Sequence, residues 1–144
     1  MKSVGDILRV KGRNVSTISP GATVFEALTH MAGRNIGALV VLDGETIVGI
    51  ISERDYARKV ILQGKSSREI PVREIMTSVM HTVRTDSTIE LCMSLMTDKH
   101  VRHLPVVEGK RLIGIVSIGD VVKALLDDKE TMIKDLKNYI TGGR

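Results

Sequence analysis

The feature that most restricts what this chain can fold into is an internal repeat. Residues 16–62 align on residues 81–127 without a gap. Upstream of each copy lies a lead-in segment: residues 4–8 resemble residues 72–76, and the first segment carries three extra residues around Lys11 to Asn14. Such a repeat is typical of one supersecondary unit that the chain builds twice. The identical pairs include Thr17 and Thr82, Gly49 and Gly114, Ser52 and Ser117, and Asp55 and Asp120.

Each copy predicts the order strand, helix, strand, strand, helix. Thr23 begins a helix with Glu26 three residues later, a capping-box pattern followed by apolar residues at helical spacing. Asp43-Gly44 predicts a tight turn between two Val- and Ile-rich runs, which are typical of strands covered on both faces. The predicted strands are residues 15–19, 38–42, 47–51, 81–84, 104–107 and 112–116, and the last helix of each copy spans residues 53–62 and 118–126. The sequence therefore predicts an α/β (α+β) fold.

Three segments follow from this pattern. Residues 1–66 form the first repeat with its N-terminal lead-in segment, residues 67–127 form the second repeat, and residues 128–144 form a C-terminal amphipathic helix. In that helix Met132, Ile133, Leu136 and Ile140 recur at helical spacing. Two interpretations are open: the helix is a subunit contact, or it folds back over its own domain.

Composition excludes several classes of function. The 144 residues are 42% hydrophobic and 26% charged, as in an ordinary globular protein. Only 2% are aromatic, and the net charge of +4 is scattered along the chain, so we expect no nucleic-acid partner. Cys92 is the single cysteine, and we assign it to the core with no metal site. No apolar run is long enough to span a bilayer, so we expect a cytoplasmic protein that has no membrane partner.

The residues best suited to bind a ligand lie where a predicted strand ends at Ser52 and a helix follows. The first amide groups of a helix are unpaired and attract phosphate, and the helix dipole favours an anion there. Asp55, one turn later, is placed to accept hydrogen bonds from the vicinal hydroxyls of a ribose. The second copy repeats this arrangement with Ser117 and Asp120. The alternative is that Ser-x-x-Asp is only a capping box, which satisfies its own helix and binds nothing.

Two further observations favour a ligand site. Each copy has a threonine the same distance upstream of the serine, Thr17 and Thr82. Gly37-Ala38 and Arg102-His103 begin the neighbouring strands, where backbone groups can contact a base.

At these residues the chain resembles a tandem pair of cystathionine-β-synthase (CBS) domains, the Bateman module. The resemblance covers residues 4–127 and includes Leu104-Pro105-Val106-Val107 and the twice-repeated Gly-x-x-Ser-x-x-Asp. The chain is similar in particular to stand-alone bacterial CBS-pair proteins and their plant organellar relatives. The resemblance implies two βαββα repeats packed by pseudo-twofold symmetry, two clefts between the repeats that bind AMP, ADP, ATP, S-adenosylmethionine or NAD, and disc-shaped dimers.

The same resemblance assigns roles to single positions. It implies that Asp55 and Asp120 hold the ribose and that Ser52 and Ser117 contact phosphate. It also implies that Thr17 and Thr82 line the phosphate or ribose side. Two short segments would frame the adenine: Ile36, Gly37 and Ala38 in the first copy, and Val101, Arg102 and His103 in the second.

Basic residues differ between the copies. Arg54 and Arg58 align with Gly119 and Lys123, and Arg102 aligns with Gly37. We therefore expect the two sites to differ in affinity or in ligand. Arg54 and Arg102 are candidates for phosphate recognition, because a guanidinium pairs bidentately with phosphate. The alternative is that they are solvated surface arginines.

The predicted function is a non-catalytic sensor that signals to an effector protein through a conformational or oligomeric change, as a homodimer. We find no combination of nucleophile, base and oxyanion donors in the sequence, so we do not expect an enzyme. The alternative is a structural dimerisation module whose ligand clefts are vestigial.

Overall fold

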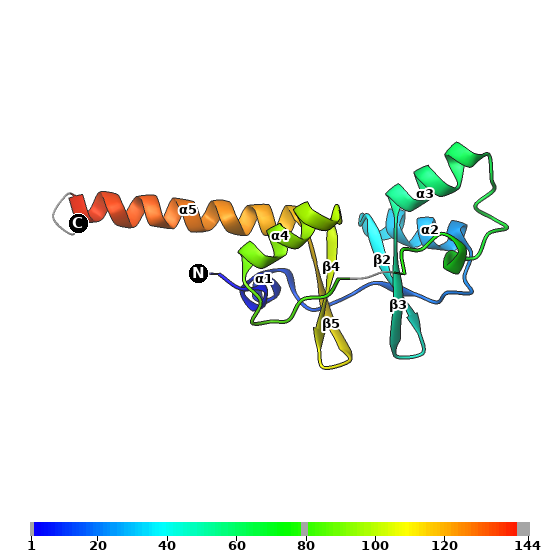
Figure 1. Cartoon of the computed structure of the whole chain (residues 1–144), viewed down its shortest axis with the longest axis horizontal. Coiled ribbons are helices and arrows are strands. Elements are labelled where there is room, and N and C mark those ends of the chain that lie inside the picture. The colour runs from blue at the N-terminus through cyan, green and yellow to red at the C-terminus, as the bar shows by residue number, and fades with distance from the viewer. Residues whose placement is uncertain (1, 79–80, 141–144) are drawn as a thin grey trace. The chain divides into compact units, whose positions relative to one another are not determined.

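The structure is a computed structural model that describes residues 2–78 and 81–140 (Figure 1). Helices and strands alternate along both halves of the chain, as predicted for an α+β fold. In order they are α1 (Val4–Lys11), β1 (Thr17–Ile18), α2 (Val24–Arg34), β2 (Ala38–Asp43), β3 (Thr46–Ser52), α3 (Glu53–Lys59), the 3₁₀ helices η1 (Ile61–Gln63) and η2 (Val72–Glu74), α4 (Ile89–Lys99), β4 (His103–Glu108), β5 (Arg111–Ser117) and α5 (Ile118–Ile140).

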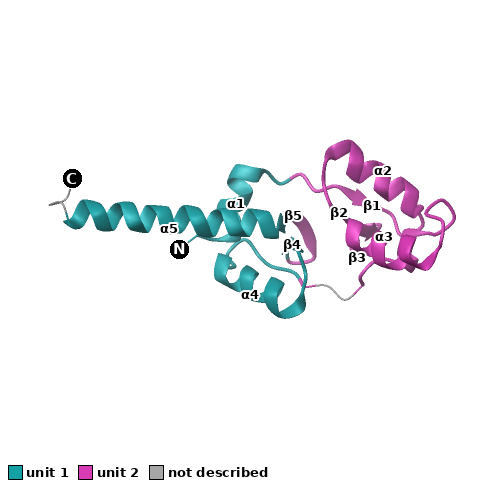
Figure 2. Ribbon diagram, turned by 90° about the horizontal axis from the view of Figure 1, so that it is seen from above, with its two compact units in different colours: residues 1–13, 82–108, 114–144 teal, residues 14–81, 109–113 magenta. Residues whose placement is uncertain are grey.

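The chain divides into two compact units, each built from segments that are separated in the sequence (Figure 2). Unit 1 comprises residues 1–13, 82–108 and 114–144, and unit 2 comprises residues 14–81 and 109–113. This division does not coincide with the predicted boundary between residues 66 and 67, because each unit contains the lead-in segment of the other copy. The boundary of the sequence repeats stays a prediction.

Unit 2 is built on a three-stranded sheet in the order β1-β2-β3. Strand β1 runs parallel to β2, with Thr17 opposite Val40, and β2 runs antiparallel to β3. The turn between β2 and β3 contains Gly44, whose φ of 63° is the left-handed conformation that glycine adopts at low cost. Helix α2 begins as predicted, since Thr23 Oγ1 accepts a hydrogen bond of 3.1 Å from the Glu26 amide. Its buried face joins the sheet and η2 in one aliphatic core of Val24, Ala27, Met31, Leu39, Val41, Ile51, Val60, Val72 and Ile75.

Unit 1 repeats this plan. Thr88 Oγ1 caps α4 by accepting from the Leu91 amide at 3.1 Å, and Ile89, Cys92 and Met96 are buried on one face of α4. The assignment of Cys92 to the core is therefore confirmed. Strands β4 and β5 form a two-stranded sheet. Both α4 and α1 pack against α5.

The predicted strand at residues 81–84 is shorter in the structure, where Val83 makes one parallel bridge to Val106. A turn follows at once, since the Ser87 amide donates to the Arg84 carbonyl at 3.1 Å and the Arg84 amide donates to Ser87 Oγ at 2.9 Å. The turn uses the backbone groups that a longer strand would pair. In the first copy the strand predicted at residues 15–19 shortens similarly to Thr17–Ile18.

Each lead-in segment packs on the hairpin of the other copy. In unit 1, Leu8 of α1 lies against Gly114, where an added Cβ would stand 2.8 Å from Leu8 Cδ2. In unit 2, Met76 lies against Gly49 in the same way, with 2.8 Å from such a Cβ to the sulfur. These two glycines recur in the repeat because a side chain there would displace the lead-in segment.

The last two helices differ from their predicted bounds. Helix α3 ends at Lys59 and is followed by the short η1, so the predicted helix 53–62 is interrupted at Val60. Helix α5 instead runs without a break from Ile118 to Ile140 and joins the two predicted helical segments. Figure 1 shows its C-terminal half continuing past α1 and α4. The apolar residues of that half are exposed, so within the described chain this helix does not fold back over its own unit.

Candidate functional site

The first candidate site, here called the first corner, is the pair Ser52 and Asp55 where β3 meets α3 in unit 2. Ser52 has an extended backbone (φ −130°, ψ 165°) and is the last residue before the helix. Its amide donates to Asp55 Oδ2 at 2.9 Å, and its Oγ accepts from the Asp55 amide at 3.3 Å. These two bonds make a complete capping box.

The second corner is the pair Ser117 and Asp120 where β5 meets α5 in unit 1. The Ser117 amide donates to Asp120 Oδ2 at 2.8 Å, and the Asp120 amide donates to Ser117 Oγ at 3.2 Å. Both aspartates therefore cap their own helices, which is the geometry that the alternative interpretation predicts. A ribose at either corner has to share the carboxylate with this cap or displace it.

Each carboxylate also faces a lysine that sequence reasoning missed. At the second corner Lys11, the last residue of α1, places Nζ 2.6 Å from Asp120 Oδ2 and 3.0 Å from the Ile115 carbonyl. At the first corner Lys59 Nζ lies 3.1 Å from Asp55 Oδ1. Lys59 follows Asp55 by four residues on a helix, a spacing that the sequence does show. Lys11 is separated from Asp120 by 109 residues, and no local pattern marks that pair.

Thr77 completes the first corner and was also missed. Its Oγ1 donates to Asp55 Oδ1 at 3.2 Å. The segment that carries it is fixed on β3, because the Thr77 amide donates to the Ile50 carbonyl at 2.8 Å and the Ile50 amide donates to the Thr77 carbonyl at 3.0 Å. Both oxygens of Asp55 are thus hydrogen-bonded. Within residues 2–78 and 81–140, Asp120 Oδ1 accepts no hydrogen bond, so the second corner keeps an open acceptor.

The electrostatics of the second corner follow from this geometry. Burial alone raises the pKa of Asp120, but the hydrogen bonds from Lys11 and from the Ser117 amide outweigh it and hold that pKa below 3.8. His103, which begins β4, has its pKa lowered from 6.5, first by burial and then by the charge of Lys11, although Asp120 acts in the opposite direction. His103 is therefore mainly neutral at pH 7, with one ring nitrogen free to accept a hydrogen bond.

The two segments that are predicted to frame the adenine reach the corners through one equivalent backbone hydrogen bond. In unit 2 the Glu53 amide donates to the Gly37 carbonyl at 3.1 Å, and in unit 1 the Ile118 amide donates to the Arg102 carbonyl at 2.9 Å. Ala38 is also the direct strand partner of Ser52. The structure thus brings the segment Ile36, Gly37 and Ala38 to the first corner, and the segment Val101, Arg102 and His103 to the second.

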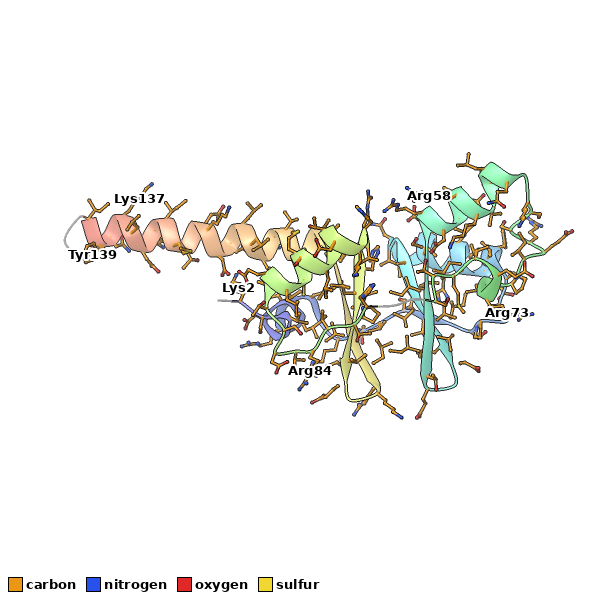
Figure 3. All side chains as sticks on the ribbon, in the orientation of Figure 1. Lys2, Arg58, Arg73, Arg84, Lys137 and Tyr139 are labelled. Carbon is orange, nitrogen blue, oxygen red and sulfur yellow. The ribbon has the colours of Figure 1, made fainter. Side chains whose placement is uncertain are left out.

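The threonines and arginines are less closely tied to the corners. Thr17 begins β1, and Thr82 immediately precedes Val83. In the described part of the chain no hydrogen bond links either threonine to a Ser-Asp pair. Arg54 is partly exposed, while Arg58 and Arg102 are exposed, and Figure 3 shows Arg58 on the surface of α3. These three arginines form no ion pair among the described residues, so both interpretations of Arg54 and Arg102 stay open.

Among the described residues, no group of three or more His, Cys, Asp or Glu side chains is arranged to hold a metal ion. None of the described helices combines the length and the apolar character that crossing a bilayer requires.

Comparison with known proteins identifies the class to which this fold and these corners belong. The sequence matches the CBS domain family over residues 4–62 and 72–127. The chain belongs to this family and carries two CBS domains, the pair known as a Bateman module. CBS pairs are in general regulatory modules without catalytic activity.

Individual relatives cover nearly the whole chain. The mitochondrial CBS domain-containing protein CBSX3 of Arabidopsis thaliana is 39% identical over 150 residues, which span 98% of this chain and 73% of the relative. A solved structure from Burkholderia ambifaria, of a CBS-domain protein described as a signal-transduction protein, is 45% identical with a TM-score of 0.85, and the match covers 88% of this chain and 96% of that chain. The CBS domain pair of protein MJ0100, solved with 5′-methylthioadenosine and S-adenosyl-L-methionine, is 27% identical with a TM-score of 0.79 and covers 89% and 98%.

Proposed function

We propose that this protein is a non-catalytic sensor that binds an adenosine-containing ligand, AMP, ADP, ATP, S-adenosylmethionine or NAD, at its two corners. The observation that carries the proposal is the repetition of one constellation in both units. Each corner joins a helix N-terminus, a carboxylate and the start of a neighbouring strand. The similar MJ0100 pair was solved with two adenosyl compounds, which supports the ligand class.

The proposed binding mode uses these groups directly. A ribose hydroxyl donates to the aspartate, and the adenine lies along the segment that begins the neighbouring strand. The second corner offers Asp120 Oδ1 as an acceptor, whereas both oxygens of Asp55 are engaged by Ser52, Lys59 and Thr77. The second corner therefore binds more tightly. Arg54 and Arg102 contact the phosphate, with Ser52 and Ser117 at the helix starts.

The sensor is proposed to act in the cytoplasm as a homodimer that signals to an effector protein. The second candidate function is a structural dimerisation module in which the corners only close helices. The capping hydrogen bonds at both aspartates favour this candidate. The two candidates differ in whether Asp55 and Asp120 bind a ligand or only cap their own helices.

A calorimetric titration separates them, and the chain supplies a matched control. Ser3 and Asp6 form a third capping box at α1, in which the Ser3 amide donates to Asp6 Oδ2 at 2.9 Å. AMP, ATP, NAD and S-adenosylmethionine are titrated into the wild type, Asp120→Ala, Asp55→Ala and Asp6→Ala.

We expect Asp120→Ala and Asp55→Ala to weaken binding by roughly tenfold or more, because a partly buried hydrogen-bond partner of the ribose is lost. Asp6→Ala leaves binding unchanged. Loss of the cap costs Asp55→Ala and Asp120→Ala about 0.5–2 kcal/mol of stability each. Absence of binding heat for all four ligands in the wild type rejects the sensor and favours the structural module. Turnover of any ligand would identify an enzyme instead.

A further inference from the structure

Helix α5 carries an exposed apolar stripe that its own unit does not cover. The stripe positions follow each other at intervals of four and three residues, the a and d positions of a heptad. Only Lys129 interrupts the series. The apolar members with their exposed fractions are Val122 (40%), Leu126 (55%), Ile133 (55%), Leu136 (61%) and Ile140 (74%).

This stripe is separate from the face that α5 uses inside unit 1. The buried residues of α5 are Val121 and Ala124, which lie on the side that packs in unit 1. Val122 and Ile140 are about five full helical turns apart, so they lie on the same side of the helix. The stripe therefore runs straight along α5. Such a stripe is suited to pack against a second helix that carries a similar apolar stripe.

The two flanks of the stripe differ in chemistry. On one flank, the g positions hold Met132 and Tyr139, exposed by 69% and 83%. On the other flank, the e positions hold Glu130 and Lys137. Figure 3 shows Lys137 and Tyr139 leaving α5 on different sides. One flank is thus apolar and the other is charged.

We propose that α5 pairs antiparallel with α5 of a second copy of this chain, in the register that places Ile133 opposite Leu136 of the second copy. Reversing one helix brings each flank against the same flank of the other helix. Met132 then packs on Tyr139 of the second copy, and Glu130 pairs with Lys137 of the second copy. Twofold symmetry makes each of these contacts twice.

The competing pairings are less favourable. A parallel pair brings the two Lys129 ammonium groups together in the seam and sets apolar Met132 against charged Lys137. An antiparallel pair shifted by one heptad places Glu130 against itself and Lys123 against Lys137. In the proposed register Lys129 lies beside Ile140, close to the C-terminal carbonyls of the other helix, which attract a cation.

Charge also argues against a lipid surface as the occupant. From Ile118 to Ile140, α5 holds four lysines (Lys123, Lys129, Lys134, Lys137) and five acids (Asp120, Asp127, Asp128, Glu130, Asp135). Helices that lie on membranes carry a polar face rich in Lys and Arg. The mixed charges of α5 suit pairing between copies.

Sedimentation equilibrium of the full chain is the first test. We expect a dimer for the wild type and a Kd raised roughly a hundredfold or more for Leu136→Glu, which buries two carboxylates in the seam. Thr131→Glu, on the exposed opposite face of α5, is the matched control and leaves the Kd unchanged. Circular dichroism verifies that both variants keep their helix. A monomeric wild type, including one that binds phosphatidylglycerol vesicles, overturns the proposal, as does a Leu136→Glu variant that dimerises like the wild type.

The register has its own test. Glu130→Lys sets like charges against each other twice, so we expect the dimer Kd to rise roughly three- to tenfold. Adding Lys137→Glu restores the pair with its signs exchanged and returns the Kd toward the wild-type value. A double variant no tighter than Glu130→Lys overturns this register.

The orientation is tested by oxidation of engineered cysteines. Cys92 does not compete, because it is buried and burial raises the pKa of its thiol to about 11. An antiparallel seam cross-links a mixture of Ile133→Cys and Leu136→Cys chains into heterodimers more than either variant alone. Efficient cross-linking of Ile133→Cys alone indicates a parallel pair and overturns the proposal.

Discussion

The contact between Lys11 and Asp120 links α1 to the second corner and can be measured by a double-mutant cycle. Lys11 Nζ is 2.6 Å from Asp120 Oδ2, and the two side chains are 34% and 25% exposed. Solvent therefore screens the pair in part, and we expect a coupling free energy of about 1 kcal/mol. Lys11→Met also loses the favourable position of a cation at the end of α1, worth about 0.5 kcal/mol.

Lys99 supplies the matched control because it is the last residue of α4, is exposed, and forms no ion pair within the described residues. Lys99→Met thus loses the helix-end contribution alone. Urea denaturation at one fixed protein concentration measures both variants, Asp120→Asn, and Lys11→Met combined with Asp120→Asn. Equal losses for Lys11→Met and Lys99→Met, or a coupling indistinguishable from zero, would refute the reasoning.

The coupling also has a defined pH dependence. The pKa of Asp120 is lower in the folded chain than its ordinary value of 3.8. Its stabilisation is therefore present above the unfolded pKa and is lost as pH falls through the folded pKa. We expect the excess stability of the wild type over Lys11→Met to be constant near neutral pH and to shrink as the pH falls below about 5. An excess that grows on acidification contradicts the assigned contact.

Four further outcomes are expected. Gly114→Ala lowers the free energy of unfolding by about 1–3 kcal/mol, because the new Cβ would stand 2.8 Å from Leu8 Cδ2. Gly33→Ala, where nothing lies within 4 Å in helix α2, stabilises by about 0.5–1 kcal/mol, and urea denaturation measures both variants. The buried Cys92 thiol, with its pKa raised to about 11, reacts with Ellman's reagent at pH 8 far more slowly than in urea; equal rates would show that it is accessible. If the proposed ribose contact at Asp120 is correct, Lys11→Met binds adenosine severalfold more tightly in calorimetry, because Lys11 no longer occupies Asp120 Oδ2 and a second ribose hydroxyl can donate to that oxygen; weaker binding would make Lys11 a ligand contact.

The parts of the fold that were predicted correctly depend on local patterns. Thr23 and Thr88 cap α2 and α4, and the turn after Asp43 joins the two strands of its hairpin. In each case the residues that determine the structure lie within four positions of one another. The positions of the two corners were predicted for the same reason, since Ser52 and Asp55 form a local motif.

The parts that were missed depend on contacts between distant residues. Each lead-in segment packs on the hairpin of the other copy. The sequence alone does not show which of the two copies a lead-in segment will pack against. The repeat did contain a partial signal, because Gly49 and Gly114 recur where Met76 and Leu8 approach. Lys11 lies in the extra residues of the first lead-in segment, yet nothing near it in sequence indicated Asp120.

Because the lysines at the two corners come from different elements, ligand binding at each corner would have different structural consequences. At the first corner the cation comes from α3 itself, and Thr77 is held by two backbone hydrogen bonds to Ile50. A ligand that displaces Lys59 from Asp55 therefore breaks a contact within one helix. At the second corner the cation comes from α1, so a ribose hydroxyl that competes for Asp120 weakens the attachment of α1 to the β5-α5 junction. If the proposed ribose contacts form, occupancy of the second corner alters how α1 packs in unit 1, whereas at the first corner the segment of Thr77 stays attached to β3 through its two backbone hydrogen bonds to Ile50.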